Sequence, residues 1–285
     1  MSSAVRYELT TVRELAPEFA EQLRVMLSKE AATMVTPEQI YVHNPSWRGH
    51  WRQILVEWLA ECGDDYDICP ISVEMAANYV DRVLALRAVS KDDLQLYGAA
   101  AILVACKARE YRVFRIAQLV DMTDDMYTPQ QFRDAERAIL ETLHWRLLPV
   151  TPRQLIPYFA QLMPIPPQRV SEVEAWGRYI AANAYTRVDF LTTPPSLIVV
   201  AALDMAAKER NVPLIGHSPS LLAELEAHED MPRCKEQLAV LREQLRERDR
   251  RKAERHGSPH AVSAADSGSG SGAPGSEAQD PSSSK

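Results

Sequence analysis

Two segments of the chain are apolar on almost every helical face. In residues 94–106, LQLYGAAAILVAC, Gln95 is the only strongly polar side chain, and in residues 197–207, LIVVAALDMAA, Asp204 is the only one. A helix that is hydrophobic all round must be enclosed by other helices. We therefore expect each segment to be the centre of a helical bundle, and their separation predicts two bundles of roughly 100 residues each, an all-α architecture.

The segments around these two centres carry helical patterns and helix-start signals. Apolar residues recur at helical spacing in residues 12–27 and again in residues 51–62. Helices are expected to begin near Pro70 and Pro232, and Ser90-x-x-Asp93 is a variant of the capping box. The sequence therefore predicts one helix after another from the N-terminal part of the chain to about residue 256.

Three of the Thr-Pro pairs are best explained as helix starts. Thr36, Thr128 and Thr151 are each followed by proline and, three residues on, by glutamine. A threonine cap, a proline in the first turn and a glutamine that reaches back to the cap are typical of a helix N-terminus. We expect these three threonines to have structural roles rather than to be sites for a proline-directed kinase.

The last 29 residues differ in composition from the rest of the chain. Residues 257–285 hold 9 Ser, 5 Gly and 3 Pro and no aromatic residue. Such a segment cannot bury enough apolar surface to offset its ordering entropy, so we expect a disordered tail. Ser258, which precedes proline in this tail, is a candidate phosphorylation site that any kinase could reach.

Charge and motif content exclude several classes of function. The formal net charge is −7, which argues against a protein that binds the phosphate backbone of nucleic acids. The four cysteines form no CxxC pair, so we expect them to be reduced thiols. No N-terminal signal segment or bilayer-length apolar run is evident, so neither secretion nor a membrane partner is expected. Without a nucleophile elbow, HExxH, P-loop or Gly-rich phosphate cradle, we expect no enzyme, no cofactor and no metal.

Four charged residues interrupt the apolar stripes. Lys107 follows directly on the first buried segment, Glu136 lies on the stripe of the helix after Thr128, and Arg52 and Asp81 lie on earlier stripes. Burial of a charge is costly unless the charge is paired. The four residues could form two structural ion pairs or extend from a bundle edge into water. Alternatively, Lys107 and Glu136 could present a paired polar clamp to another protein.

Several separate motifs follow one another in a fixed order over about residues 20–210. They are residues 51–59 (WRQILVEWL), 78–82 (NYVDR), 94–101 (LQLYGAAA), 105–107 (ACK), 123–128 (TDDMYT), 136–140 (ERAIL), 143–147 (LHWRL) and 188–197 (VDFLTTPPSL). In this order they resemble the cyclin family. The second half is most similar to D-type cyclins, whereas residues 123–128 also resemble mitotic cyclins. The fold that this resemblance implies is two five-helix cyclin boxes, in agreement with the two bundles.

The resemblance implies a domain organisation and a function. We expect an N-terminal helical extension (residues 1–35), a first cyclin box that binds a kinase (36–148), a second cyclin box (149–256) and the tail (257–285). The implied function is that of a non-catalytic regulatory subunit, which binds and activates a cyclin-dependent Ser/Thr kinase in cell-cycle control at G1/S. A nuclear and cytoplasmic location follows, and Arg250-Arg251-Lys252 could serve as a weak nuclear-import signal.

The resemblance implies a role for each of the four charged residues that interrupt the apolar stripes. Lys107 and Glu136 match the pair that grips the regulatory helix of the kinase. Arg52 and Asp81 match an internal salt bridge that joins the first two helices of the box. At the edge that would face the kinase, Arg109 stands where relatives often have an acidic residue, which reverses a charge.

A second surface matches the patch on which the family docks leucine-anchored substrate and inhibitor peptides. Ile54 and Leu55 could instead be ordinary core residues. Trp51 stands where the family usually has methionine, and no L-x-C-x-E stretch occurs, although D-type cyclins often carry one. The residues that match the patch are Trp51, Ile54, Leu55, Trp58, Glu61, Leu94 and Gln95.

Two other functions remain open at this point. A transcriptional cyclin or a general transcription factor would share the fold, although the acidic balance disfavours direct contact with DNA. A helical adaptor that has lost kinase binding is the second alternative. The presence of both Lys107 and Glu136 argues against such a loss.

Overall fold

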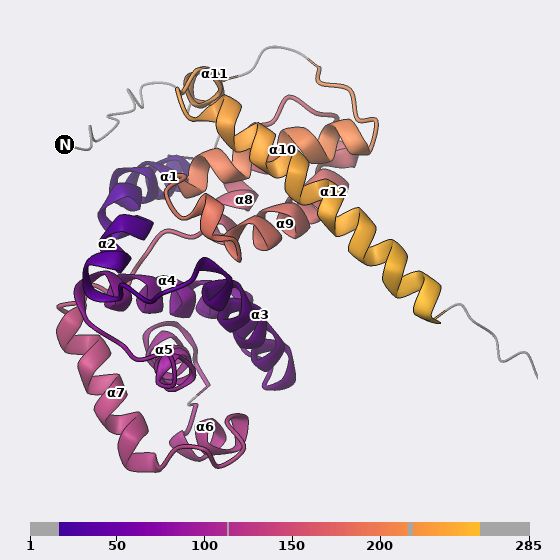
Figure 1. Ribbon diagram of the computed structural model, residues 1–285. Coiled ribbons are helices and arrows are strands. Elements are labelled where there is room, and N and C mark those ends of the chain that lie inside the picture. Colours follow the sequence, from indigo (N-terminus) through magenta and orange to yellow (C-terminus); the bar gives the residue numbers. More distant parts are fainter. Residues whose placement is uncertain (1–16, 113, 216–218, 257–285) are drawn as a thin grey trace, which may run out of the picture. The chain divides into compact units, whose positions relative to one another are not determined.

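A computed structural model describes residues 17–112, 114–215 and 219–256, and every regular element in these ranges is helical (Figure 1). This confirms the all-α class expected from the sequence. The chain divides into two units, with the boundary between Gln244 and Leu245. The tail expected at residues 257–285, with Ser258, lies outside the described residues, as does the part of the first apolar stripe before residue 17.

The first bundle is built around helix α5. This helix (Leu94–Arg109) contacts α3 (Gly49–Asp65), α4 (Pro70–Leu86), α6 (Ile116–Met122) and α7 (Pro129–Thr142), and Figure 1 shows it end-on among them. Every residue of α5 from Gly98 to Cys106 is buried. The apolar segment therefore occupies the centre of a bundle, as its lack of a polar face requires.

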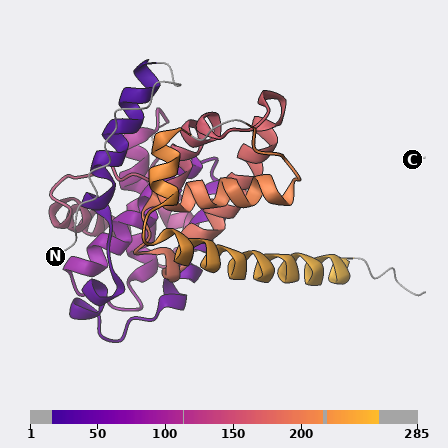
Figure 2. The same cartoon turned by 90° about the horizontal axis from the view of Figure 1, so that it is seen from above.

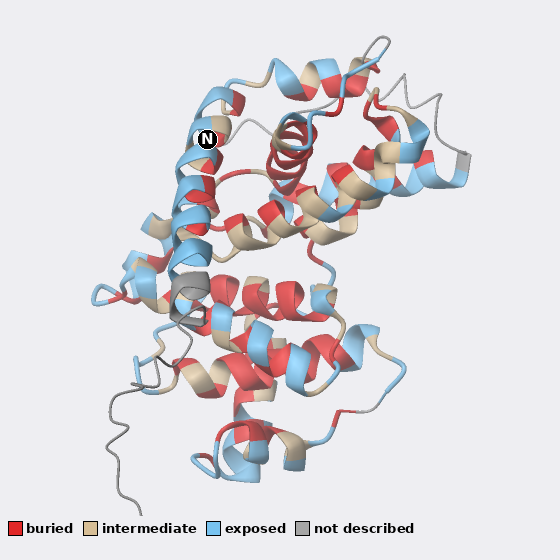
Figure 3. Cartoon of the chain, turned by 90° about the vertical axis from the view of Figure 1, so that its right-hand side faces the viewer, coloured by how far each residue is buried: buried red, intermediate tan, exposed pale blue. Residues whose placement is uncertain are grey.

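The second bundle is built in the same way around helix α10 (Pro195–Glu209). It packs against α8 (Pro152–Leu162), α9 (Val170–Tyr185) and α11 (Ser220–Glu226). In helix α12 (Met231–His256), Lys235 Nζ lies 3.4 Å from Asp204 Oδ2 of α10. Figure 3 shows that buried residues (red) lie on the inner sides of the helices and that exposed residues (pale blue) lie outside. The fold thus has two helical bundles in tandem.

Shorter elements complete the chain. Helices α1 (Pro17–Lys29) and α2 (Pro37–His43) precede the first bundle, and α2 packs against α4. The 3₁₀ turns are η1 (Glu30–Thr33), η2 (Pro167–Arg169) and η3 (Val188–Phe190). The last helix, α12 (Met231–His256), is the yellow ribbon in Figure 2.

The predicted helix starts are present at all three threonine positions. Thr36 and Thr128 each exchange hydrogen bonds with the glutamine three residues on, which closes a capping box. At Thr151 the backbone N–H donates to the Gln154 side chain at 2.8 Å. Proline at the first helical position fits because its missing N–H would have had no intrahelical partner.

Buried polar contacts join the two bundles, and spacing along the sequence does not reveal them. Glu74 of α4 accepts hydrogen bonds from the Arg153 backbone N–H and from its guanidinium, both at 3.2 Å. The Tyr185 hydroxyl, from α9, donates to the Glu74 backbone carbonyl at 3.2 Å. Helix α4 therefore contacts two helices of the second bundle through one residue.

Glu30 links the N-terminal elements to the second bundle. Its carboxylate accepts hydrogen bonds from the backbone N–H of Ser196 and, at 2.9 Å, from the Ser196 hydroxyl, in the first turn of α10. Pro194, the N-cap residue of α10, makes no capping hydrogen bond with its side chain. Burial raises the pKa of Glu30 to about 7, although the Ser196 hydrogen bonds oppose the shift. A carboxylate from residue 30 thus caps the central helix of the second bundle.

The position of Glu30 predicts a pH-dependent stability that the variant Glu30→Gln should lack. In the folded chain Glu30 keeps its proton above its ordinary pKa of 4.5. The contribution of protonated Glu30 to the free energy of unfolding is therefore complete below that pKa and is lost as the pH rises through about 7. Relative to Glu30→Gln, the free energy of unfolding should fall by about 2–3 kcal/mol between pH 5 and pH 8. Urea unfolding of both proteins measures this difference, and a difference that does not vary with pH would contradict it.

Candidate functional site

Lys107 is the first charged side chain after the buried stretch of α5. Residues 98–106 are enclosed on all sides, whereas Lys107 lies in the last turn of the helix. Its side chain is 50% exposed. A cation near the C-terminal end of a helix is favourably placed with respect to the helix dipole. The core of the bundle therefore delivers this ammonium group to the bundle edge.

Glu136 reaches the same edge from α7. Phe132 and Ile139 bury one side of that helix, and Glu136 lies at the border of this buried side with 15% of its side chain exposed. Lys107 Nζ donates to Glu136 Oε1 at 2.6 Å. An ammonium has three N–H donors, so this contact leaves donors that can face an approaching protein. The structure thus brings the two residues together at an accessible position.

A large aromatic side chain that spacing along the sequence did not indicate is exposed in the turn after α7. Trp145 is 71% exposed. It and His144 have φ angles of 59° and 48°, in the left-handed region that non-glycine residues rarely occupy. These two residues follow the end of the helix, and the backbone N–H of Trp145 donates to the backbone carbonyl of Leu140 at 3.1 Å. The turn that follows α7 therefore directs an apolar ring into solvent, nine residues after Glu136.

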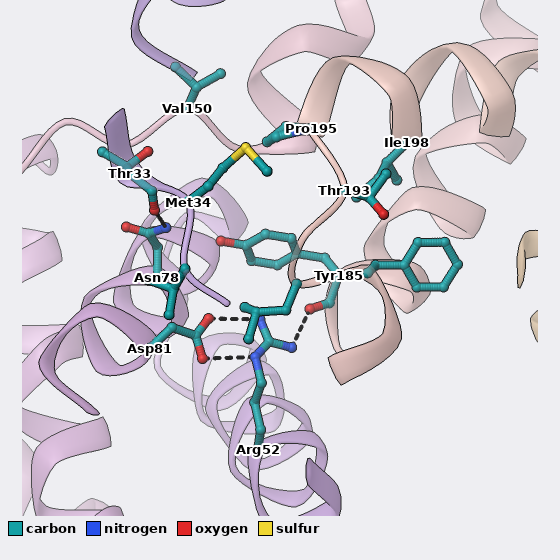
Figure 4. Close-up of a pocket in the computed structure, with 13 residues that line it drawn as sticks. Thr33, Met34, Arg52, Asn78, Asp81, Val150, Tyr185, Thr193, Pro195 and Ile198 are labelled. Atoms are coloured by element: carbon teal, nitrogen blue, oxygen red, sulfur yellow. Dashed lines mark hydrogen bonds and ion pairs between the residues drawn. The ribbon is translucent and has the colours of Figure 1, made fainter. Parts of the chain in front are cut away.

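Arg52 and Asp81 form a buried ion pair between α3 and α4. The guanidinium donates to both carboxylate oxygens, at 2.8 and 2.9 Å, and the two side chains are 3% and 4% exposed (Figure 4). Burial alone would lower the pKa of Arg52, but Asp81 more than offsets this and raises it. Burial raises the pKa of Asp81, although Arg52 opposes this shift, so the pair holds two enclosed groups whose hydrogen bonds offset the cost of burial.

The guanidinium of Arg52 also reaches the second bundle. Its Nη1 donates to the Tyr185 backbone carbonyl at 2.8 Å, and its carbon lies 5.6 Å from the centre of the Tyr185 ring (Figure 4). The family resemblance predicted a role for Arg52 within the first bundle only. In the structure one guanidinium bridges α3, α4 and the end of α9, so it also fixes the second bundle on the first.

The residues predicted to dock peptides divide into a floor and a surface. Leu55 and Leu94 are buried, whereas Ile54 is 61% exposed. Trp51, Trp58 and Gln95 are half-buried, and Glu61 is exposed. Of the two residues that could have been ordinary core, Leu55 therefore lies in the core and Ile54 does not.

Arg109 is exposed at the end of α5, and no hydrogen bond or ion pair of its side chain is present in the described residues. In those ranges, no cluster of three or more His, Cys, Asp or Glu side chains could hold a metal ion. No helix in the described part of the chain is long and apolar enough to cross a bilayer.

Comparison with known proteins finds similarity to cyclins. Residues 21–148 match the cyclin N-terminal domain. Cyclin-A2 of Xenopus laevis is 31% identical over 191 residues, which cover 66% of this chain and 45% of the relative. These matches support a member of the cyclin family. Cyclin-A1 of Mus musculus is 33% identical over 193 residues, and G1/S-specific cyclin-D1 of Bos taurus is 26% identical over 205 residues, or 70% of each chain.

The relatives differ in how similar they are to this chain. Similarity to D-type cyclins is present, but its identity is lower than that of the cyclin A relatives. The chain spans about half the length of the curated cyclin A proteins that it matches.

Solved structures show the same tandem fold. A viral cyclin from herpesvirus saimiri superposes with a TM-score of 0.63 at 18% identity, covering 77% of this chain and 97% of the viral one. A chain of the yeast RNA Pol II CTD kinase CTDK-1 complex gives a TM-score of 0.57 at 12% identity, covering 72% and 71%. At identities this low the likeness concerns the fold alone. The two superpositions confirm the tandem arrangement of two helical boxes.

The two ion pairs should differ in what they contribute to stability. Asp81→Ala leaves the buried guanidinium of Arg52 without its partner, so the free energy of unfolding should fall by about 3–5 kcal/mol. Lys107→Ala removes an ion pair at the surface and should cost less than about 1 kcal/mol. Chemical denaturation of both variants measures this contrast. Equal losses in the two variants would show that the pairs do not differ in this way.

Proposed function

We propose that this cyclin binds and activates a cyclin-dependent Ser/Thr protein kinase in cell-cycle control at G1/S, and takes no part in the chemistry itself. The observation that carries the proposal is the exposed Lys107–Glu136 pair, within the segment that matches the cyclin N-terminal domain. A clamp for a partner must be formed before binding and must be reachable. This pair satisfies both conditions.

The chemistry of the clamp suits the end of a helix. The last four carbonyl groups of a helix have no partner within the helix and carry partial negative charge. Lys107 can donate its remaining N–H groups to such carbonyls while Glu136 holds the ammonium in place. The kinase helix is thereby held in one of its two positions, in which the kinase's own Lys–Glu pair can form.

Activation of this kind is a shift of population. The cyclin supplies binding energy to one of two kinase conformations, and only differential affinity moves such an equilibrium. Trp145, exposed at the end of the helix that carries Glu136, adds an apolar anchor of the kind that contributes strongly to protein interfaces. The polar clamp and the aromatic anchor together form the kinase-binding surface in this proposal.

A second surface belongs to the same proposal. Trp51, Ile54, Trp58 and Glu61 share one face of α3, and we call this row the docking stripe. Its exposed and half-buried apolar side chains, above the floor made by Leu55 and Leu94, suit leucine-anchored substrate or inhibitor peptides.

The proposal extends to location, modification and domain limits. It places the complex in nucleus and cytoplasm, without direct contact to nucleic acid or membrane, and makes Ser258 a substrate of the partner kinase. It also keeps the domain limits expected from the sequence, with the first cyclin box at residues 36–148 and the second at 149–256.

The clamp can be tested with Lys107→Ala and Glu136→Ala. Each change removes one half of the pair, so binding to a panel of purified cyclin-dependent kinases, and activation of the bound kinase, should fall at least about tenfold. Circular dichroism should show that both variants remain folded, because the pair lies at the surface.

The chain contains a matched control for this experiment. Lys208 ends α10 as Lys107 ends α5, and it pairs with Asp204 at 2.8 Å. Its side chain is likewise exposed. Lys208→Ala should bind and activate kinase as the wild type does. Wild-type binding in both clamp variants, or equal losses in the control, would contradict the proposal.

Docking has a separate test. Trp58→Ala removes apolar surface from the docking stripe, so phosphorylation of leucine-anchored substrates by the complex should slow more than that of short peptides without the anchor. Steady-state rates on the two substrate classes provide the comparison. If Trp58→Ala affects both classes equally, the stripe does not dock substrates.

A further inference from the structure

A lysine covers the first residue of the docking stripe. Lys91 lies in the turn that leads into α5, and its Nζ is 5.4 Å from the centre of the Trp51 ring. An ammonium above an indole is attracted to the negative face of the ring. The charge of Lys91 is therefore held at a defined place, at the end of the stripe where α3 begins.

The apolar part of the stripe lies beyond this lysine. Ile54 is exposed and Trp58 is half-buried, three and seven residues after Trp51, so they follow it on the same face of α3. The floor beneath is tightly packed, since a Cβ atom at Gly98 would come within 2.8 Å of Leu55 Cδ1. An apolar anchor can thus rest on Ile54 and Trp58, whereas Lys91 occupies the ring of Trp51.

The opposite end of the stripe carries a negative charge. Glu61 is exposed ten residues after Trp51, which at 1.5 Å per residue places the two ends about 15 Å apart along the helix. In the described part of the chain neither Lys91 nor Glu61 forms an ion pair. The stripe is therefore an apolar strip with a cation at one end and an anion at the other.

The turn that carries Lys91 also carries two acidic residues, Asp92 and Asp93. Asp93 accepts a hydrogen bond from the Ser90 hydroxyl at 2.7 Å. Burial, with Asp93 and Asp92 close by, raises the pKa of Tyr127. The Tyr127 hydroxyl donates to the Asp92 backbone carbonyl at 2.8 Å, so this turn contacts Tyr127 as well as Trp51.

We propose that the docking stripe selects peptides of mixed charge: an apolar anchor with an acidic residue on the Lys91 side and a basic residue on the Glu61 side. An extended peptide advances about 3.3 Å per residue, so the two charges should stand about four to five residues apart. The occupant follows from charge complementarity at the two ends of the strip. This inference rests on the docking part of the proposed function and names the class of peptide that it takes.

Fluorescence anisotropy with the full chain tests the inference. The probes are labelled twelve-residue peptides with one central leucine and two charged residues five positions apart. The charges are Asp and Arg in both orders, Arg and Arg, or Asp and Asp. One of the two mixed-charge orders should bind at least about fivefold more tightly than either like-charged peptide.

Variants at Lys91 decide whether this residue causes the preference. Lys91→Met keeps the length of the side chain but removes its charge, so the advantage of the mixed peptide over the Arg–Arg peptide should disappear. Lys91→Glu should reverse it. Lys208→Met, at an exposed lysine of the second bundle, should bind every peptide as the wild type does.

The outcomes separate this inference from the proposals on which it rests. Arg–Arg binding equal to the mixed peptide in the wild type, or a Lys91→Met variant with an unchanged preference, overturns the inference alone. Absence of binding to any of the peptides overturns it together with the docking proposal. Kinase binding depends on Lys107 and should be unchanged in all Lys91 variants, so its loss there would also contradict the assignment.

Discussion

Helices α5 and α10 have no polar face, so each can exist only inside a ring of other helices, and the remaining structure follows from this constraint. Residues 98–106 are enclosed completely, and the first charge that can reach water is Lys107, at the end of α5. Glu136 meets it there because Phe132 and Ile139 fix the orientation of α7. The position of the proposed clamp is thus a consequence of core packing.

Buried charges then fix the bundles to each other. The guanidinium of Arg52 bonds to Asp81 in the first bundle and to the Tyr185 carbonyl in the second, and Glu30 caps α10 from outside the second bundle. Burial of such groups costs free energy, which the paired hydrogen bonds offset only in one arrangement. A surface that is to hold a partner helix in one of two positions benefits from this rigidity, because a yielding surface would favour neither position.

The sequence predicted those features that depend on neighbours within one helix. The apolar segments, the threonine caps and the four interrupting charges were all visible from spacing alone. The bond from Arg52 to Tyr185 spans 133 positions and that from Ser196 to Glu30 spans 166, so no periodicity could indicate them. The exposure of Trp145 depends on two left-handed residues, and the position of Lys91 depends on the turn before α5, which only tertiary packing determines.

The central claim is that Lys107 and Glu136 act on the kinase as one unit. A double-mutant cycle on binding to a cyclin-dependent kinase, with Lys107→Ala, Glu136→Ala and the double variant in calorimetric titrations, measures their coupling directly. If Glu136 works by holding Lys107, the double variant should lose no more affinity than Lys107→Ala alone. Strictly additive losses would mean that each residue contacts the kinase independently, and the absence of any loss would remove the clamp from the mechanism.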